Sequence, residues 1–126
     1  MTKQIINTSN APAPIGPYSQ AVKVGNLLFI SGQVAIEPAT GNVISSNIAD
    51  ETKQVMKNIL AILTNAGAGF EHIVKTTIFL SDMALFADVN TVYGSYFEKD
   101  FPARETVAVK GLPKNVNVEI SVTAFL

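Results

Sequence analysis

The chain has 126 residues, 48 % of them hydrophobic, which suits the core of one domain and leaves no length for a second. Its 9 Lys and Arg residues nearly balance its 10 Asp and Glu residues and form no basic block, which argues against binding to nucleic acid. It has no cysteine and a single histidine, which excludes disulfides and thiolate metal sites and argues against a histidine-based metal site.

The sequence also gives no sign of a membrane segment or of a nucleotide cofactor. No stretch approaches the roughly 20 apolar residues that span a bilayer, and the first residues lack the apolar run of a signal peptide. The glycines do not form a phosphate-binding loop. We therefore expect a cytoplasmic protein that works without membrane, metal or cofactor.

The N-terminal part of the chain predicts a stiff loop between a short strand and a hairpin. Prolines recur within residues 11–18 and push their preceding residues towards extended geometry, so this stretch is predicted as a loop. A short strand is possible at residues 3–6. Strands are expected at residues 20–24 and 27–31, because Gly25-Asn26 between them is typical of a two-residue hairpin turn.

The middle of the chain predicts two helices around a strand. The first helix is expected at residues 48–66, with Asn47 as its N-cap and Gly67 as its stop signal. A strand rich in β-branched residues is expected at residues 73–80. The second helix is expected from residue 83 to about residue 98. Its inward stripe consists of Phe86, Val89, Asn90, Tyr93 and Phe97.

Two closing strands complete an α+β pattern. They are expected at residues 104–110 and 117–125, joined by a hairpin-like turn at residues 111–115. Two helices can cover about one face of the resulting five- or six-stranded sheet. Residues 27–30 are apolar on both sides, so both faces of that strand should be buried. An uncovered apolar sheet face is an association surface, and we therefore expect an oligomer.

Three side chains are candidates for chemistry, each with a plainer alternative. Arg104 is the only arginine, and its planar guanidinium can bind a carboxylate through two parallel hydrogen bonds. The alternative is a surface arginine beside an acidic neighbour. Glu119 lies on the polar side of its strand, where it orients a water or is simply solvated. Asn90 falls on an apolar stripe, so its amide either holds a loop or lines a site. Tyr18 and Ser31 add hydroxyls, and His72 is interpreted as structural or solvent-facing.

Several motifs in order along nearly the whole chain resemble the reactive-intermediate deaminases, the RidA type. These motifs are IGPYSQA at residues 15–21, FISGQV at 29–34, FPAR at 101–104, LP at 112–113 and VEI at 118–120. The segments NIL at residues 58–60, AGA at 66–68 and FADVNTVY at 86–93 agree as well.

The resemblance implies a fold, an assembly and a site. The single domain, residues 1–126, is expected to have a chorismate-mutase-like mixed sheet with two helices on one face. Three copies are expected to form a homotrimer whose sheets make a central barrel, with sites between subunits. The family's anchoring arginine corresponds to Arg104 and its water-orienting glutamate to Glu119. The family's supporting residues correspond to Tyr18, Ser31 and Asn90. Gly32 corresponds to a family glycine whose backbone lies against the ligand.

The implied activity is hydrolysis of 2-iminobutanoate and 2-iminopropanoate to 2-keto acids and ammonia, without cofactor. Many bacterial members have Ser-Cys after the arginine, where this chain has Glu105-Thr106. The missing cysteine puts in doubt any redox or thiol-modification chemistry at this position, but hydrolysis does not require it. Strand alternation predicts that Glu105 points away from the face of Arg104. Three other functions stay open: a carboxylate-binding regulatory module without turnover, a ribonuclease or translation inhibitor, and a scaffold that acts through a protein partner. The presence of both Arg104 and Glu119 favours the enzyme.

Overall fold

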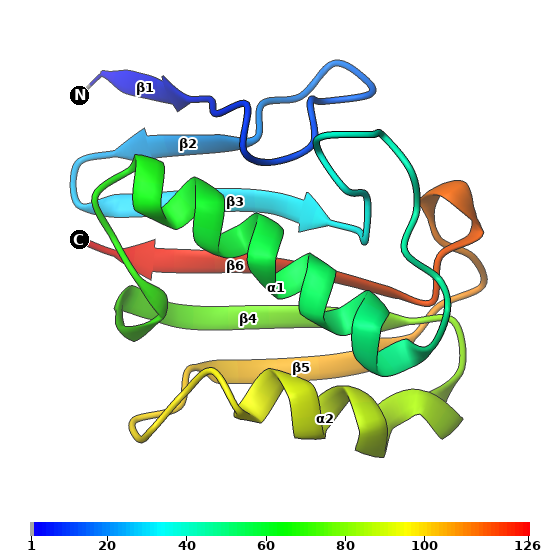
Figure 1. Ribbon diagram of the computed structural model, residues 1–126. Coiled ribbons are helices and arrows are strands. Elements are labelled where there is room, and N and C mark those ends of the chain that lie inside the picture. The colour runs from blue at the N-terminus through cyan, green and yellow to red at the C-terminus, as the bar shows by residue number, and fades with distance from the viewer. Residues whose placement is uncertain (1) are drawn as a thin grey trace.

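The computed structural model describes residues 2–126 as one sheet with two α-helices (Figure 1). The strands are β1 (Lys3–Ile6), β2 (Ala21–Val24), β3 (Leu27–Gln33), β4 (Ile73–Leu80), β5 (Ala103–Ala108) and β6 (Val118–Phe125). The helices are α1 (Ile48–Asn65) and α2 (Phe86–Gly94), and short 3₁₀ turns lie at Phe70–His72, Met83–Leu85 and Pro113–Asn115. The predicted order of strands and helices, including the short first strand, is confirmed.

The sheet has six strands in the order β1-β2-β3-β6-β4-β5. The predicted hairpin between the last two strands is wrong, because β4 lies between β5 and β6. A helix connects β4 to β5, and this crossover makes the two strands parallel. The chain then crosses the end of β4, and β6 runs antiparallel to both β3 and β4. The C-terminal strand therefore occupies the middle of the sheet.

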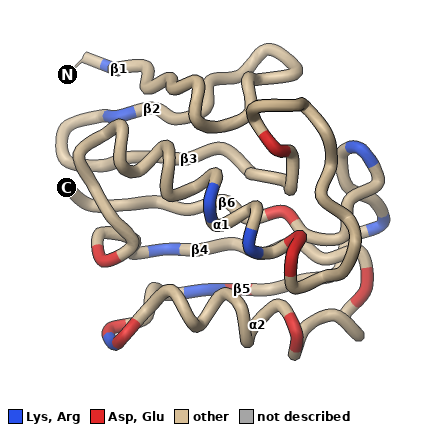
Figure 2. The backbone as a smooth tube through the Cα atoms, in the orientation of Figure 1, with Lys and Arg blue, Asp and Glu red and all other residues tan. Residues whose placement is uncertain are grey.

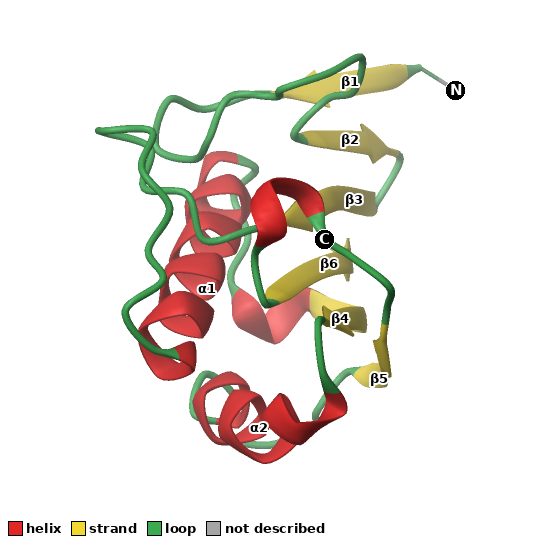
Figure 3. Ribbon diagram, turned by 90° about the vertical axis from the view of Figure 1, so that its right-hand side faces the viewer, coloured by secondary structure: helices red, strands yellow, loops and turns green. Residues whose placement is uncertain are grey.

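Both helices lie on the same side of the sheet (Figure 3). The Asn47 side chain accepts a hydrogen bond from the Asp50 backbone N–H at 2.8 Å, which caps the start of α1. Gly67 follows the helix with a φ of 79°, a left-handed conformation that suits glycine. The apolar stripe of α1 packs on the sheet, where Ile59 and Ile120 are fully buried. No helix within residues 2–126 has the length and apolarity needed to cross a membrane.

The second helix is shorter than predicted. It ends at Gly94, and the chain continues in turns in which Tyr96 N–H donates to Tyr93 and Phe97 N–H donates to Gly94. Two features end the helix early: glycine weakens a helix interior, and the Ser95 hydroxyl donates to the Val92 carbonyl at 2.6 Å. The predicted inward stripe nevertheless holds, since Val89 and Tyr93 are buried.

The face of the sheet opposite the helices is open and carries several exposed apolar side chains. Leu28 and Ile30 point towards the helices and are buried, but Leu27 and Phe29 are 39 % and 45 % exposed. The expectation that both faces of this strand are buried is therefore wrong for the single chain, because the two helices cover only one side. Ile5, Val107 and Phe125 are also exposed, and strand alternation puts them on this open face. A face that exposes several large apolar side chains in this way favours association.

Candidate functional site

Arg104 is held on the helix side of the sheet by a polar and an aromatic contact. Its Nη1 donates to the Asn90 Oδ1 of α2 at 2.7 Å. Its Cζ lies 5.6 Å from the ring centroid of Phe86 and 5.3 Å from that of Tyr93, within the range of cation–π attraction. Asn90 thus occupies one donor, and the remaining N–H groups of the guanidinium are available to a carboxylate.

Tyr93 anchors this arrangement, a role that the sequence interpretation missed. Its hydroxyl donates to the Thr76 Oγ1 of β4 at 2.9 Å, and both side chains are buried. Burial raises the pKa of Tyr93 above its ordinary value, while the Thr76 hydrogen bond and the charge of Arg104 lower it. A hollow of about 340 Å³ opens beside the guanidinium. It is lined by Asn90, Tyr93, Gly94, Phe101, Pro102 and Arg104.

Glu119 lies on the opposite side of the sheet, in β6. It is paired in register with Phe79 of β4, and its carboxyl group lies on Gly32 of β3. A Cβ atom at position 32 would be 2.5 Å from Glu119 Oε2, so only glycine leaves room for this carboxylate. Burial raises the pKa of Glu119 above its ordinary value. No hydrogen bond or ion pair to the carboxylate is found within residues 2–126.

A β-bulge creates the close approach of Gly32. Between Ile30 and Gln33, β3 advances by one residue more than β6, whose partners are Val122 and Ile120. The Ser31 hydroxyl donates to the Ser19 carbonyl at 2.6 Å, which ties the bulge to the preceding loop.

Tyr18, Ser31, Gly32 and Glu119 all line one hollow of about 350 Å³. The Tyr18 side chain is 47 % exposed, and its hydroxyl oxygen accepts a hydrogen bond from the Ile15 backbone N–H at 3.2 Å. The rest of the lining is Pro12, Ala13, Ile15, Gln20, Gln33, Val34, Ile36 and Pro113. Four of the six predicted site residues are thus brought together here.

Two buried amides fix the walls of this hollow. Gln20 is 2 % exposed, and its Nε2 donates to the carbonyls of Thr8, Ala11 and Pro12. Asn58 of α1 is fully buried and donates from Nδ2 to the carbonyls of Val34 and Ile36. Sequence reasoning did not assign these two amides to the site. The signal for Asn58 was the one that singled out Asn90, a polar residue on an apolar helical stripe.

A buried carboxylate of α1 holds the start of β6. Glu51 is 1 % exposed and accepts hydrogen bonds from the backbone N–H groups of Asn117 and Val118, at 2.7 and 3.1 Å, and from the Asn117 side chain at 3.1 Å. These contacts position the strand just before Glu119. His72 has a structural role as expected, since its Nδ1 accepts the Gly69 N–H at 3.0 Å.

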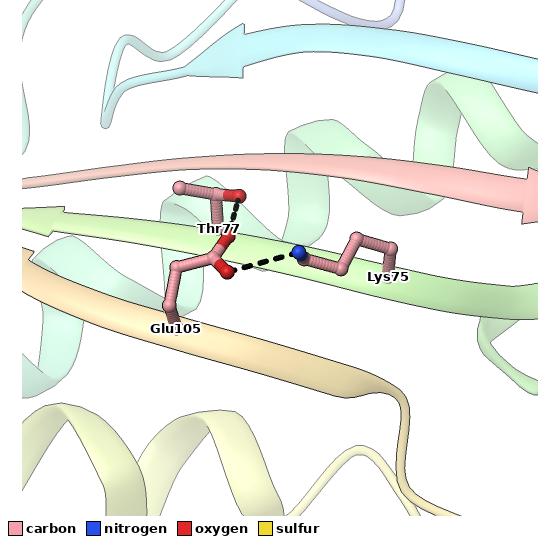
Figure 4. A network of polar contacts seen from close by, with 3 residues as sticks. All are labelled: Lys75, Thr77 and Glu105. Carbon is pink, nitrogen blue, oxygen red and sulfur yellow. Dashed lines mark hydrogen bonds and ion pairs between the residues drawn. The ribbon is translucent and has the colours of Figure 1, made fainter.

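The six predicted residues lie in two groups on opposite faces of the sheet. Arg104 and Asn90 lie against α2, and Glu119 lies on the open face with Gly32. Glu105 also points to the open face, as alternation predicted, where it contacts Thr77 at 2.6 Å and Lys75 at 2.9 Å (Figure 4). The Thr77 and Lys75 hydrogen bonds lower the pKa of Glu105. Within one chain, Arg104 and Glu119 cannot contact the same small ligand.

Charge and potential metal ligands are dispersed over the described part of the chain. Lys and Arg positions are spread over β1, β2, α1, β4 and β5 instead of forming one stripe (Figure 2). Among residues 2–126, no group of three or more His, Cys, Asp or Glu side chains gathers in a way that could hold a metal ion. The chemistry available here is that of a guanidinium, an amide, hydroxyls and one unpaired carboxylate.

Comparison with known proteins identifies the family. The model of the family described as endoribonuclease L-PSP matches residues 8–126, and the chain belongs to this family. It is 44 % identical over 125 residues to human 2-iminobutanoate/2-iminopropanoate deaminase, covering 99 % of this chain and 91 % of that protein.

Solved structures agree in fold. A Rid-family protein of unknown function from Yersinia pestis has a TM-score of 0.96 and 47 % identity, covering 99 % of this chain and 100 % of that one. TdcF from E. coli with bound serine has a TM-score of 0.93 and 37 % identity, covering 98 % of each chain. The mixed fold with a six-stranded sheet and two helices is therefore that of the Rid proteins, and relatives of this chain are named imine deaminases.

Proposed function

We propose that this protein hydrolyses the C=N bond of small 2-imino acids, such as 2-iminobutanoate and 2-iminopropanoate, to 2-keto acids and ammonia. The observation that carries the proposal is the pair of complementary half-sites: a guanidinium with free donors, and a carboxylate that has no partner among residues 2–126. A carboxylate-binding fork and a group that can handle protons are what this hydrolysis requires. The name of the human relative supports the substrate class.

The two half-sites are joined when a second copy of the chain covers the open sheet face. In this arrangement, Arg104 and Asn90 of one subunit face Tyr18, Ser31, Gly32 and Glu119 of the next. A head-to-tail interface forms a ring when its rotation closes, and we propose a closed homotrimer whose sheets form a central barrel. The exposed apolar residues of the open face support association through that face.

Catalysis consists of positioning together with proton transfer. Arg104 binds the substrate carboxylate in two parallel hydrogen bonds and fixes C2 near Glu119. Glu119 accepts a hydrogen bond from a water and removes its proton as the water oxygen bonds to C2, while the C=N π electrons move to the nitrogen, which takes that proton from Glu119. In the resulting carbinolamine, Glu119 removes the hydroxyl proton and passes it to the amine nitrogen as the C=O bond forms and the C–N bond breaks, so ammonia leaves and the carboxylate is restored. Such groups contribute on the order of 10²–10⁴-fold, enough for an imine that already reacts with water.

The direct test is keto-acid release from 2-iminobutanoate made in situ by a threonine dehydratase, with semicarbazide as the competing trap for the imine. The wild type should accelerate release, and Arg104→Ala should not. If the folded wild-type protein gives no acceleration, the proposed activity on this substrate is wrong.

A second function, a non-catalytic sensor of small carboxylates, is favoured by the serine bound to TdcF. A sensor needs Arg104 but has no use for an unpaired carboxylate at position 119. Binding of 2-oxobutanoate without any turnover of the imine would select the sensor over the enzyme. The dispersed positive charge and the net charge of −1 speak against a ribonuclease.

A further inference from the structure

A carboxylate without a positive partner is buried beneath the start of β6. Glu51 is 1 % exposed, and no Lys, Arg or His pairs with it within residues 2–126. Burial of an unpaired charge is unfavourable. Two features offset this effect: the first turn of α1, where the helix dipole favours negative charge, and three neutral hydrogen-bond donors. Apolar packing alone does not explain a charged group at this position.

The three donors belong to the two residues that precede Glu119. Oε2 of Glu51 accepts the backbone N–H groups of Asn117 and Val118, and Oε1 accepts the side-chain amide of Asn117. One oxygen bound to two successive N–H groups fixes the strand along its length, and the amide contact fixes its rotation. Asn117 and Glu119 point to the same side of β6, because side chains alternate along a strand. Glu51 therefore determines how β6 presents Glu119.

Asn117 is tied to the end of β4 as well. Its Oδ1 accepts the Ser81 hydroxyl at 2.8 Å, and its carbonyl accepts the Ser81 N–H at 3.0 Å. The start of α1, the end of β4 and the start of β6 are thus joined at one residue, at the same end of the sheet (Figure 1).

The turn that leads into β6 is strained. Lys114 and Asn115 have left-handed φ values of 56° and 55°, which are unfavourable for residues with a Cβ atom. Movement of the chain after the turn would relieve this strain, and Glu51 holds that part of the chain. Little movement is tolerable, because the Glu119 carboxyl group lies directly on Gly32.

We propose that Glu51 is a positioning residue, which holds Asn117 and Val118 so that the Glu119 carboxylate stays over Gly32. Its effect on the reaction rate rests on the proposed function, whereas its effect on Glu119 does not. Glu51 lines neither the hollow beside Glu119 nor the hollow beside Arg104. It therefore acts on the catalytic step and leaves binding of the substrate carboxylate at Arg104 unchanged.

Two substitutions separate the hydrogen bonds of Glu51 from its size. Glu51→Met removes all three acceptors but keeps an unbranched side chain of similar length. Glu51→Gln keeps one oxygen for the two backbone N–H groups. The Asn117 amide can then turn its oxygen towards the new NH₂ group, because the Ser81 hydroxyl can donate or accept. We expect kcat for 2-iminobutanoate to fall at least about tenfold in Glu51→Met and to stay within about twofold of the wild type in Glu51→Gln.

Ile62→Ala is the control for a general loss of stability. Ile62 is fully buried on the same helix, about 16 Å beyond Glu51, so the cavity lowers Tm without affecting the start of β6. Glu51→Met should lose kcat but keep its affinity for 2-oxobutanoate, measured by calorimetry, and Ile62→Ala should keep both. A parallel loss of kcat and affinity in Glu51→Met, or equal kcat values in the two variants, would overturn the inference.

Titration of the Glu119 carboxyl carbon by NMR, assigned with Glu119→Gln, gives a readout that does not depend on turnover. The pKa of Glu119 depends on its burial and on the proposed contact with Arg104 of the next subunit, and both depend on where the carboxylate lies. We expect this pKa to change in Glu51→Met and to equal the wild-type value in Glu51→Gln and Ile62→Ala.

The proposed function and the role of Glu51 can fail separately. If the wild type does not hydrolyse the imine, the proposed function is wrong, and the pKa comparison still decides whether Glu51 positions Glu119. If the pKa of Glu119 is the same in Glu51→Met as in the wild type, Glu51 does not position the carboxylate, whatever the protein hydrolyses.

Discussion

Position 32 shows how one absent side chain shapes the site. A Cβ atom there would lie 2.5 Å from Oε2 and 2.8 Å from Cδ of Glu119, so alanine forces the carboxylate to move. We predict that Gly32→Ala lowers kcat by about 10²-fold, the usual effect of displacing a catalytic group by about 1 Å. The measurement is the semicarbazide-competition assay, together with thermal unfolding to confirm that the variant folds.

Gly111→Ala is the control for this substitution. A Cβ atom at position 111 meets nothing within 4 Å, so the change tests loss of a glycine without a clash. It should leave kcat within about twofold of the wild type, since isolated surface changes have small effects. A fully active Gly32→Ala would mean that the position of the Glu119 carboxylate does not matter to the reaction.

Glu119 should lower the stability of the protein at neutral pH. Burial raises its pKa in the folded state above the ordinary value of 4.5, so the charged form is disfavoured there. Its contribution to stability is complete below pH 4.5 and is lost as pH rises through the raised value. We therefore predict that Glu119→Gln has a higher Tm than the wild type at pH 7, and that the difference vanishes near pH 4.

The exposed Glu98 provides the comparison, because Glu98→Gln removes the same charge without touching the site. Its Tm should change little between the two pH values relative to the wild type. If Glu119→Gln proves less stable than the wild type at pH 7, attraction to Arg104 of the neighbouring subunit outweighs the cost of burying the Glu119 charge in the assembly.

Elements are held in place by buried amides as well as by apolar packing. Asn58 links α1 to the carbonyls of Val34 and Ile36 after β3. Asn58→Ala leaves both buried acceptors without a partner, and we predict a loss of about 2–3 kcal/mol in the free energy of unfolding, measured with urea. Asn65→Ala removes an exposed amide at the end of the same helix and should cost less than about 0.5 kcal/mol. Equal losses would show that the two acceptors find other partners.

The elements themselves were largely predictable because their signals are local. The cap at Asn47, the stop at Gly67 and the turn at Gly25 fixed the first helix and the hairpin. The end of the second helix was misjudged, because an aromatic stripe continues beyond Gly94 into turns. The pairing of β5 was also misjudged, since sequence neighbours suggest a hairpin whereas the α2 crossover separates β5 from β6.

The site residues could be predicted only in part. Arg104 and Glu119 are proposed from their residue types and from the family resemblance, but their location on opposite faces depends on strand register. Gln20 and Tyr93 act through partners distant in sequence, Thr8 to Pro12 and Thr76, and no local pattern reveals such contacts. The sequence alone therefore does not predict the strand register or the side-chain hydrogen bonds between residues that are distant in the chain.

At the scale of the whole molecule, a site divided between two faces should be complete only in an oligomer. If the proposed site is divided in this way, an Arg104→Ala subunit and a Glu119→Gln subunit each retain the half that the other lacks. We predict that refolding equal amounts of the two inactive variants together restores activity. In a mixed ring of three, about one interface in three pairs two intact halves, so random mixing restores about one quarter of wild-type activity.

The control for complementation is the double variant Arg104→Ala/Glu119→Gln, mixed with either single variant. No interface in these mixtures pairs two intact halves, so activity should stay at the background level. Activity in the first mixture but not in the controls requires that Arg104 and Glu119 act from different subunits. No recovery in assemblies that native mass spectrometry shows to contain both variants would mean that Arg104 and Glu119 of different subunits do not form one site.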